Sequence, residues 1–297
     1  MKGLVYIGVT AFLASAVYAG PPVALSGGGT PSAAAPPADG IGSVISSFKM
    51  SPLAEPFALG VYRDPSYVYG AMYTSGTDYL YRFTPGGARV SSFALNGTLK
   101  PRGADPAHLG FGYLSVVDAD ARKLYVFRTT GGSPVTKFSV GGSPYPLNCF
   151  WDGNYYYVNG SSDVGKFNRY TTAGAGAGRW TCAGWPGVIT TVGGAAYAHR
   201  GNNGKGPYLV ACSWTARQPM CMTTFPGGLL IRTWTVPANN GNGLAYGDSS
   251  KPGVYGAAVW GCWYTNDGMY AMQFDVEARG AAVVVPVSLG KVKSLYR

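Results

Sequence analysis

Alternating apolar and polar residues, broken by glycine-containing turns, recur along most of this chain. The pattern is clearest in LYRFTPGGARVSSF (80–93), LYVFRTTGGSPVTKF (124–138), KFNRYTTAGAGAGRW (166–180), CMTTFPGGLLIRTW (221–234) and YAMQFDVEARGAAVVV (270–285). Each of these segments reads as a strand, a tight turn and a second strand that ends on an aromatic or β-branched residue. Outside the N-terminus, no long segment has the apolar spacing of a helix. The pattern therefore predicts an all-β fold.

A further pair of short strands is expected before each hairpin. These pairs fall in residues 60–73, 110–117, 148–158, 195–214 and 244–260. Units of about four strands and roughly 40 to 50 residues, repeated along a chain, are typical of β-propellers. The repeats thus predict a β-propeller over residues 42–297, with five or six four-stranded blades.

The start of the propeller region repeats the end of a blade. GSVISSF (42–48) resembles ARVSSF (88–93), which ends the first hairpin. A propeller is closed by pairing its first and last blades, so Val44–Phe48 is expected to be the outer strand of the last blade. Residues 281–289 also resemble an outer strand, which leaves two alternatives: a sixth blade built from both termini, or one surplus terminal strand. An unpaired apolar strand is a template for another chain.

The N-terminus resembles an export signal. Lys2 precedes an apolar run from Leu4 to Val17, and Val17-Tyr18-Ala19 fits a signal-peptidase site. The alternative is a retained membrane anchor, although the run is shorter than the roughly 20 apolar residues of a spanning helix. We expect residues 1–19 to be a cleaved signal peptide and residues 20–41, rich in Pro, Gly and Ala, to be an arm or linker. The mature protein is then secreted or at the cell surface, with no membrane segment.

One repeat carries a family resemblance. NCFWDGNYYYV (148–158), followed by KFNRY (166–170), resembles the blade repeat of secreted bacterial β-propeller proteins, which reads approximately G-L-A-W-D-G-x-Y-L-W-V and then I-Y-K-L-D. The closing SLGKVKSLYR also resembles the C-terminal tail of such proteins. The resemblance implies a propeller and export. It implies no activity, because propellers host many unrelated functions.

Composition and charge narrow the choice of partners. The formal net charge is +10, but Lys and Arg are scattered along strands and turns rather than clustered, and only 12% of residues are charged. This distribution disfavours nucleic acid as a partner and leaves an acidic cell-surface polysaccharide as a candidate. The 22 tyrosines and 7 tryptophans either fill the space between blades or form a sugar-binding or self-association surface.

The sequence offers few groups for catalysis. His108 and His199 lie in different repeats without metal-ligand spacing, although both could line the centre of the ring. Recurring aspartates, such as Asp152, are best explained as turn formers, because no calcium loop is apparent beyond Asp118-Ala119-Asp120. SSDVGKF (161–167) matches a sialidase box only in part, and no pair of carboxyls suits glycosidase chemistry. We expect no enzyme activity, metal or cofactor.

Five cysteines, an odd number, are disulfide candidates in an exported protein. Cys212 and Cys221 flank one turn, and Cys149 and Cys182 fall within one repeat, so these two pairs are the predicted bridges.

Together these features predict a non-enzymatic extracellular structural protein that assembles with copies of itself, into a filament or surface layer, by exchange of terminal strands. The predicted assembly residues are Val44, Ile45, Phe48, Val283, Val284, Val285 and Val287. The alternative function is a secreted glycan- or peptide-binding module.

Overall fold

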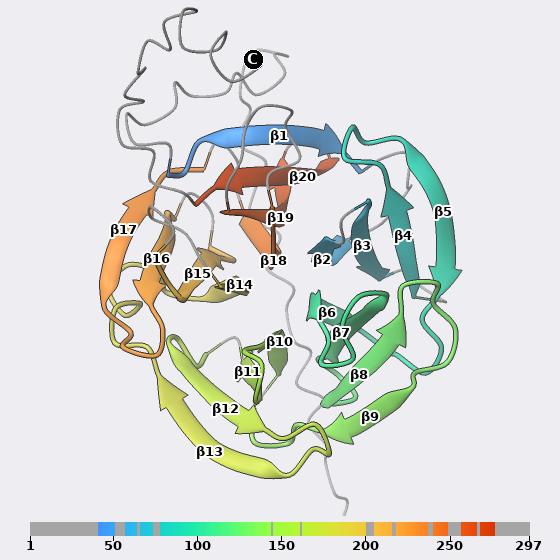
Figure 1. Cartoon of the computed structure of the whole chain (residues 1–297), viewed down its shortest axis with the longest axis horizontal. Coiled ribbons are helices and arrows are strands. Elements are labelled where there is room, and N and C mark those ends of the chain that lie inside the picture. The colour runs from blue at the N-terminus through green and yellow to red at the C-terminus, as the bar shows by residue number, and fades with distance from the viewer. Residues whose placement is uncertain are drawn as a thin grey trace, which may run out of the picture. The chain divides into compact units, whose positions relative to one another are not determined.

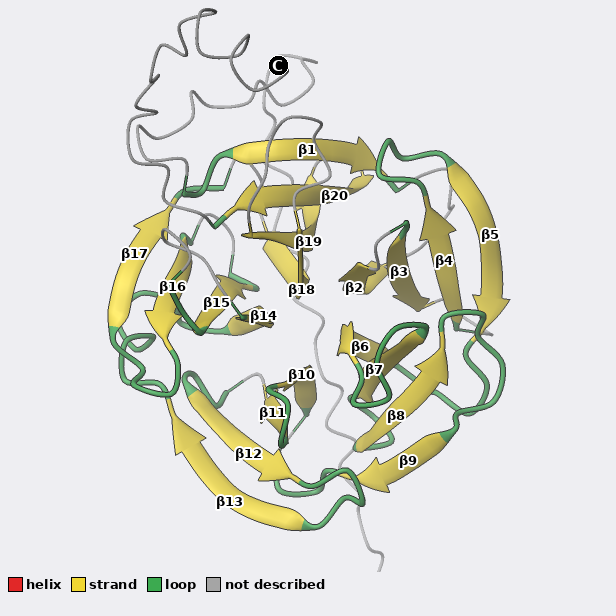
Figure 2. Ribbon diagram, viewed as in Figure 1, coloured by secondary structure: helices red, strands yellow, loops and turns green. Residues whose placement is uncertain are grey.

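The computed structural model describes residues 41–50, 57–63, 66–73, 78–143, 145–160, 162–199, 205–215, 218–236, 240–248, 257–265 and 268–276. All of them belong to one compact unit, Pro31–Arg297. The regular structure of these residues is entirely β, as Figure 2 shows. Accordingly, no helix within the described ranges has the length and apolar character needed to cross a bilayer.

The described strands form five antiparallel sheets of four strands each, arranged as the blades of a ring (Figure 1). Blade 1 contains β2 (Phe57–Arg63), β3 (Val68–Tyr73), β4 (Tyr79–Phe83) and β5 (Arg89–Ala94). Blade 2 contains β6 (Pro101–Pro106), β7 (Tyr113–Asp118), β8 (Lys123–Arg128) and β9 (Thr136–Ser139). Blade 3 contains β10 (Pro146–Trp151), β11 (Tyr156–Gly160), β12 (Lys166–Tyr170) and β13 (Gly176–Thr181).

Blade 4 contains β14 (Val192–Ala198), β15 (Tyr208–Ser213), β16 (Met220–Thr224) and β17 (Leu230–Trp234). Blade 5 contains β18 (Asn240–Asp248), β19 (Ala257–Thr265) and β20 (Gly268–Asp275), with β1 (Val44–Lys49) as its outer strand. The all-β propeller is thus confirmed, and the number of blades is five.

The ring is closed by the N-terminal strand, as predicted. Strand β1 pairs antiparallel with β20, from Val44 opposite Phe274 to Lys49 opposite Tyr270. The four-stranded fifth blade is therefore completed by residues from both ends of the propeller region. The second predicted outer strand, residues 281–289, lies outside the described residues, as do the predicted signal peptide and nearly all of the predicted arm.

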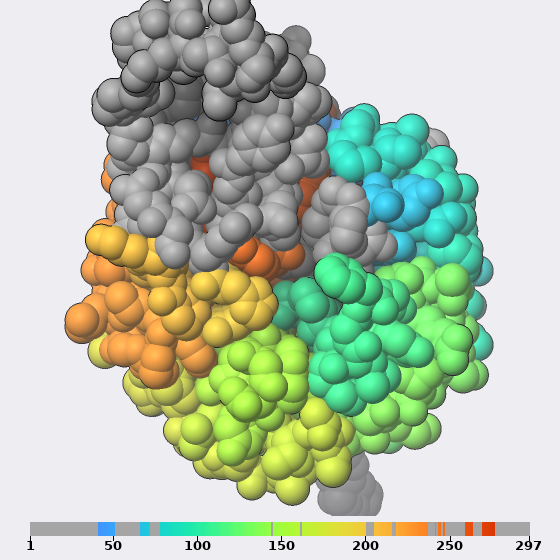
Figure 3. Space-filling model, in the orientation of Figure 1, coloured from blue at the N-terminus to red at the C-terminus, as the bar shows by residue number. Residues whose placement is uncertain are grey.

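Successive blades pack directly against each other, and each contact between neighbours, here called a seam, contains one apolar cluster. For example, Phe48, Phe83 and Trp260 meet in the seam between blades 5 and 1. The space-filling view shows the green and yellow-green surfaces of blades 2 and 3 meeting in this way (Figure 3). The hydrophobic core of the protein is therefore divided among the seams rather than concentrated in one centre.

Aromatic residues of the outer strands lie against glycines of the next blade. A Cβ atom added to Gly87 would lie 2.5 Å from Cβ of Phe48, and one added to Gly131 would lie 2.3 Å from Cβ of Phe93. The same arrangement joins Phe138 to Gly174 and Trp234 to Gly42. These glycines have positive φ angles, which residues with a Cβ rarely adopt. In the outer strands β1, β5, β9 and β17, one aromatic residue therefore packs closely against the next blade.

The innermost strands approach each other closely around the ring axis. A Cβ atom on Gly103 in β6 would lie 2.8 Å from the carbonyl oxygen of Leu147 in β10. Likewise, a Cβ atom on Gly194 in β14 would lie 2.6 Å from the carbonyl carbon of Gly243 in β18. In blade 2 the innermost strand is Pro101–Pro106, which the sequence pattern did not predict. Small residues at these positions allow the blades to meet near the axis.

Candidate functional site

The predicted assembly residues fall into two groups. Val44, Ile45 and Phe48 lie in β1, and Phe48 is buried with its ring centre 5.5 Å from that of Phe83 and 5.8 Å from that of Trp260. Val44, Ile45 and Phe48 therefore belong to a strand that already pairs within its own propeller. Val283, Val284, Val285 and Val287 lie outside the described residues.

Strand β17 gives blade 4 an apolar outer edge. It pairs with β16 on one side, and no other described strand pairs with it. Leu229, Leu230 and Ile231 are 66%, 44% and 41% exposed. At the other described outer edges, Val90 of β5 and Val135, next to β9, have comparable exposure at 43% each. An exposed apolar edge strand is a ready template for pairing with another chain.

Three consecutive blades share a tyrosine–arginine contact. The guanidinium carbon lies over the tyrosine ring at 4.5 Å for Arg82 on Tyr67, 5.8 Å for Arg128 on Tyr113 and 5.5 Å for Arg169 on Tyr155. Each tyrosine packs against the seam with the next blade. Each begins or directly precedes the second strand of its blade. These six residues lie at one end of the blades and are called the Tyr–Arg face below.

Stacking alone is a poor explanation for these arginines. A cation over an aromatic ring contributes about 0.5–1 kcal/mol at an exposed site. The Nε atoms of Arg82 and Arg169 are buried and have no acceptor, and an unsatisfied buried donor costs about 1–3 kcal/mol. Moreover, no described carboxylate forms an ion pair with Arg82, Arg128 or Arg169. Among the described residues, the three charges therefore have no ion-pair partner.

The loop between β6 and β7 lies beside the Arg128 contact. Thr129, next to Arg128, donates its backbone N–H to the carbonyl oxygen of Gly112 at 2.9 Å. In this loop Phe111 is 82% exposed and Leu109 is 46% exposed. The Tyr–Arg face therefore combines positive charge with a projecting apolar loop.

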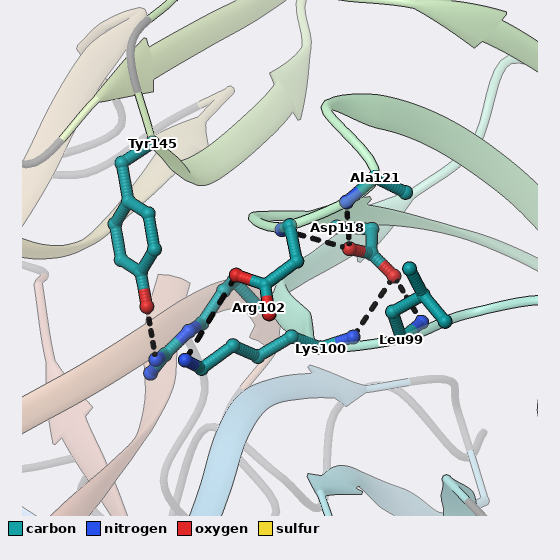
Figure 4. Close-up of polar contacts among 7 residues, drawn as sticks. Leu99, Lys100, Arg102, Asp118, Ala121 and Tyr145 are labelled. Carbon is teal, nitrogen blue, oxygen red and sulfur yellow. Dashed lines mark hydrogen bonds and ion pairs between the residues drawn. The ribbon is translucent and has the colours of Figure 1, made fainter. Parts of the chain in front are cut away.

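A second basic and aromatic cluster lies at the opposite end of β6 (Figure 4). Arg102 donates from Nη2 to the hydroxyl oxygen of Tyr145 at 3.1 Å, and Lys100 lies 3.9 Å from the Asp120 carboxylate. The Asp118 carboxylate accepts four backbone N–H groups, those of Leu99, Lys100, Asp120 and Ala121. Lys100 is therefore paired with a carboxylate, whereas Arg102 donates to a neutral hydroxyl and its Nε has no acceptor. The four bonds to Asp118 show that its carboxylate holds a turn.

The turn-forming role expected of the recurring aspartates is confirmed at Asp152. Its Oδ1 accepts the backbone N–H groups of Asn154 at 2.7 Å and Tyr155 at 2.8 Å. Within the part of the chain that the structure describes, no group of three or more His, Cys, Asp or Glu side chains could hold a metal ion.

The two histidines lie apart, each among aromatic rings. Nδ1 of His108 lies 2.7 Å from the hydroxyl oxygen of Tyr156, which also accepts the backbone N–H of His108 at 3.1 Å. The Tyr156 hydroxyl therefore contacts both the ring and the backbone of His108. Burial lowers the pKa of His108. The other histidine, His199, contacts the rings of Tyr197 and Tyr246.

A buried carboxyl lies in the seam between blades 2 and 3. Asp105 accepts the backbone N–H of Trp151 through Oδ2 at 3.2 Å, whereas its Oδ1 has no partner. Burial raises the pKa of Asp105 well above its usual range. Nearby, burial raises the pKa of the Cys149 thiol to about 12. Cys149 is thus protonated at neutral pH and is not activated as a nucleophile.

The predicted disulfides are wrong. All five cysteines are buried free thiols. Cys221 lies opposite Ala211 rather than Cys212, so the two thiols point to opposite faces of blade 4. Cys212 faces the seam with blade 5 and Cys221 the seam with blade 3. Cys149 and Cys182 likewise lie in the two different seams that flank blade 3.

The comparisons support the fold and leave the activity open. No protein-family model matches the chain, and no curated protein matches it in sequence. Glutaminyl cyclase from Myxococcus xanthus is similar in structure with a TM-score of 0.54 and 10% identity, over 80% of this chain and 97% of that one. The tail fibre of a Staphylococcus aureus phage is similar with a TM-score of 0.50 and 9% identity, over 79% of this chain and 52% of that one.

Hydrazine synthase from Kuenenia stuttgartiensis is similar with a TM-score of 0.40 and 13% identity, and the match spans 73% of this chain but 58% of that one. At these identities the similarities concern the fold. They do not test the resemblance to secreted bacterial repeat proteins.

Proposed function

We propose that this protein is a non-enzymatic, extracellular structural subunit that assembles by strand addition. In this proposal the segment Ala281–Leu289 of one copy pairs with the edge of β17 in another. The observation that carries the proposal is that β1 already fills the outer position of blade 5. Each of the five described blades already has four strands, the strand-like sequence AAVVVPVSL follows the last of them along the chain, and β17 offers an apolar edge.

Both the donated strand and the β17 edge have groups that would stabilise the contact. A donated strand adds several backbone hydrogen bonds, each contributing about 0.5–1.5 kcal/mol net. It also covers Leu229, Leu230 and Ile231, and full burial of such side chains contributes about 1.5–3 kcal/mol each. Pro286 lacks an N–H donor, so that position must face away from β17. Because donor and acceptor are different surfaces, the contact is head-to-tail and generates an open filament unless its rotation closes a ring.

The proposed extracellular location is supported by the N-terminal sequence pattern, with Lys2, an apolar run and Val17-Tyr18-Ala19. A structural role is supported by the scarcity of catalytic groups among the described residues. The thiol of Cys149 is protonated, and the two histidines lie apart.

The test uses two complementary variants, one without the donor (deletion of residues 281–297) and one with an altered acceptor (Leu230→Lys with Ile231→Lys). Particle size is followed by light scattering and electron microscopy. The full chain is expected to form concentration-dependent polymers and each variant alone to stay monomeric. A mixture of the two variants is expected to form dimers, because one intact donor can meet one intact acceptor.

Val90→Lys, at the edge of β5, is the matched control and should polymerise like the parent. The proposal fails if the parent is monomeric at high concentration, or if either variant polymerises as before.

A further inference from the structure

We propose that the Tyr–Arg face is a binding site for an acidic polysaccharide, with one carboxylate of the polymer held at each of three consecutive seams. This inference does not depend on strand addition, because the residues involved belong to blades 1 to 3, whereas β17 belongs to blade 4.

The first argument is recurrence. Tyr67, Tyr113 and Tyr155 occupy the same place in blades 1, 2 and 3, each facing the next blade. Each carries an arginine from the third strand of its own blade over its ring. The third strands of blades 4 and 5 contain no arginine. The charges therefore form an arc along three neighbouring seams, which suits a polymer with regularly spaced anionic groups rather than a single small ion.

The second argument is orientation. A guanidinium over a ring makes no hydrogen bond to the ring face, so its N–H groups can still donate to the two oxygens of a carboxylate. The Nε atoms of Arg82 and Arg169 are buried, so their guanidinium groups are held in place by the surrounding residues. No described carboxylate forms an ion pair with the three arginines, so among the described residues their charge is available to a ligand.

The third argument concerns the kind of polymer. The guanidinium carbon lies 4.5 to 5.8 Å from the centre of each tyrosine ring, which leaves less of the ring available to stack with nucleic acid bases, as single-stranded nucleic acid binding usually requires. Phe111, 82% exposed on the neighbouring loop, offers an apolar surface of the size of one sugar ring. One carboxylate does lie near: Asp152, which caps the turn before Tyr155. It lies at the third seam, so the weakest of the three subsites is expected at Arg169.

The test measures binding of polygalacturonate to the full chain by calorimetry, with neutral dextran and single-stranded DNA as further probes. The triple variant Arg82→Gln, Arg128→Gln and Arg169→Gln should weaken polygalacturonate binding by about tenfold or more, since three charge-assisted contacts are lost. The matched control carries Lys123→Gln, Lys137→Gln and Arg179→Gln, which removes the same charge from exposed positions elsewhere. It should change affinity by about twofold at most, as expected for screened long-range charge.

Arg128→Gln alone, at an exposed position, keeps the test informative if the triple variant does not fold, and it should still weaken binding. Arg128→Lys should restore part of the affinity, because it keeps the charge and loses the planar fork. The proposal would be overturned if the triple variant and its control lost affinity for polygalacturonate equally. It would also be overturned if dextran bound as tightly as polygalacturonate, or if single-stranded DNA bound more tightly than polygalacturonate.

Discussion

Truncation of Phe48 tests whether strand β1 holds the ring closed. The ring of Phe48 is 8% exposed and fills the seam between blades 5 and 1, where it contacts Phe83 and Trp260. Replacing a buried Phe by Ala costs about 3–5 kcal/mol, because apolar surface is lost and a cavity remains. A change of 1 kcal/mol lowers the Tm of a chain of this size by about 2–4 °C. Phe48→Ala should therefore lower Tm by on the order of 10 °C.

The measurement is thermal unfolding followed by near-UV circular dichroism. Phe93→Ala provides the control, because Phe93 occupies the corresponding place in β5 and also lies against a glycine, Gly131, but is only half-buried. Its Tm should fall by less. If Phe48→Ala lowers Tm by no more than Phe93→Ala does, β1 is not the closing strand that its burial indicates.

Three further predictions concern buried groups. Gly87→Ala places a methyl group 2.5 Å from Cβ of Phe48 at a positive φ, so the free energy of unfolding measured by chemical denaturation should fall. The control Gly86→Ala, with open space around it, should change the free energy of unfolding little. Equal effects of the two variants would contradict the packing of Phe48 on Gly87. The raised pKa of Asp105 means that its contribution to stability is full below its ordinary value of 3.8 and is lost as pH rises through the folded-state pKa. Asp105→Asn should therefore gain in Tm relative to the parent as pH rises from about 4 to about 8, and a pH-independent difference would count against a buried neutral carboxyl. Finally, all five thiols should be unreactive towards a thiol reagent in the native state and all five should react in denaturant; a smaller number after unfolding would indicate a disulfide.

The outer strands could be predicted from the sequence because similar short phrases follow a glycine-containing turn in successive repeats. VISSF and VSSF are nearly identical, and both adopt the same position in their blades. The innermost strand of blade 2 could not be predicted in this way. Pro101, Gly103 and Pro106 all disfavour a strand by local propensity. They are tolerated because the prolines lie at the two ends of β6 and Gly103 makes room for the backbone of β10.

The Tyr–Arg face was missed because the sequence scatters its members. Each arginine follows its tyrosine by 14 or 15 positions, so the three pairs do not form a cluster of charged or aromatic residues along the sequence. The aligned repeats did contain the signal, as the endings YRF, VFR and NRY. The disulfide prediction failed for a related reason. Proximity along a hairpin does not determine on which face of the sheet a side chain lies, and a shift of one residue in the strand pairing moves the side chain to the other face.

Closure by β1 also bears on how the chain folds. Lys49 pairs with Tyr270, so the last blade joins residues more than 220 positions apart. Bringing the ends of so long a segment together costs about 5 kcal/mol of chain entropy by the logarithmic law for loops. The other four blades consist of consecutive hairpins and can form earlier. Until the ring closes, β20 of one molecule can accept β1 of another with the same contacts, so the protein concentration during folding decides between closed monomers and swapped dimers.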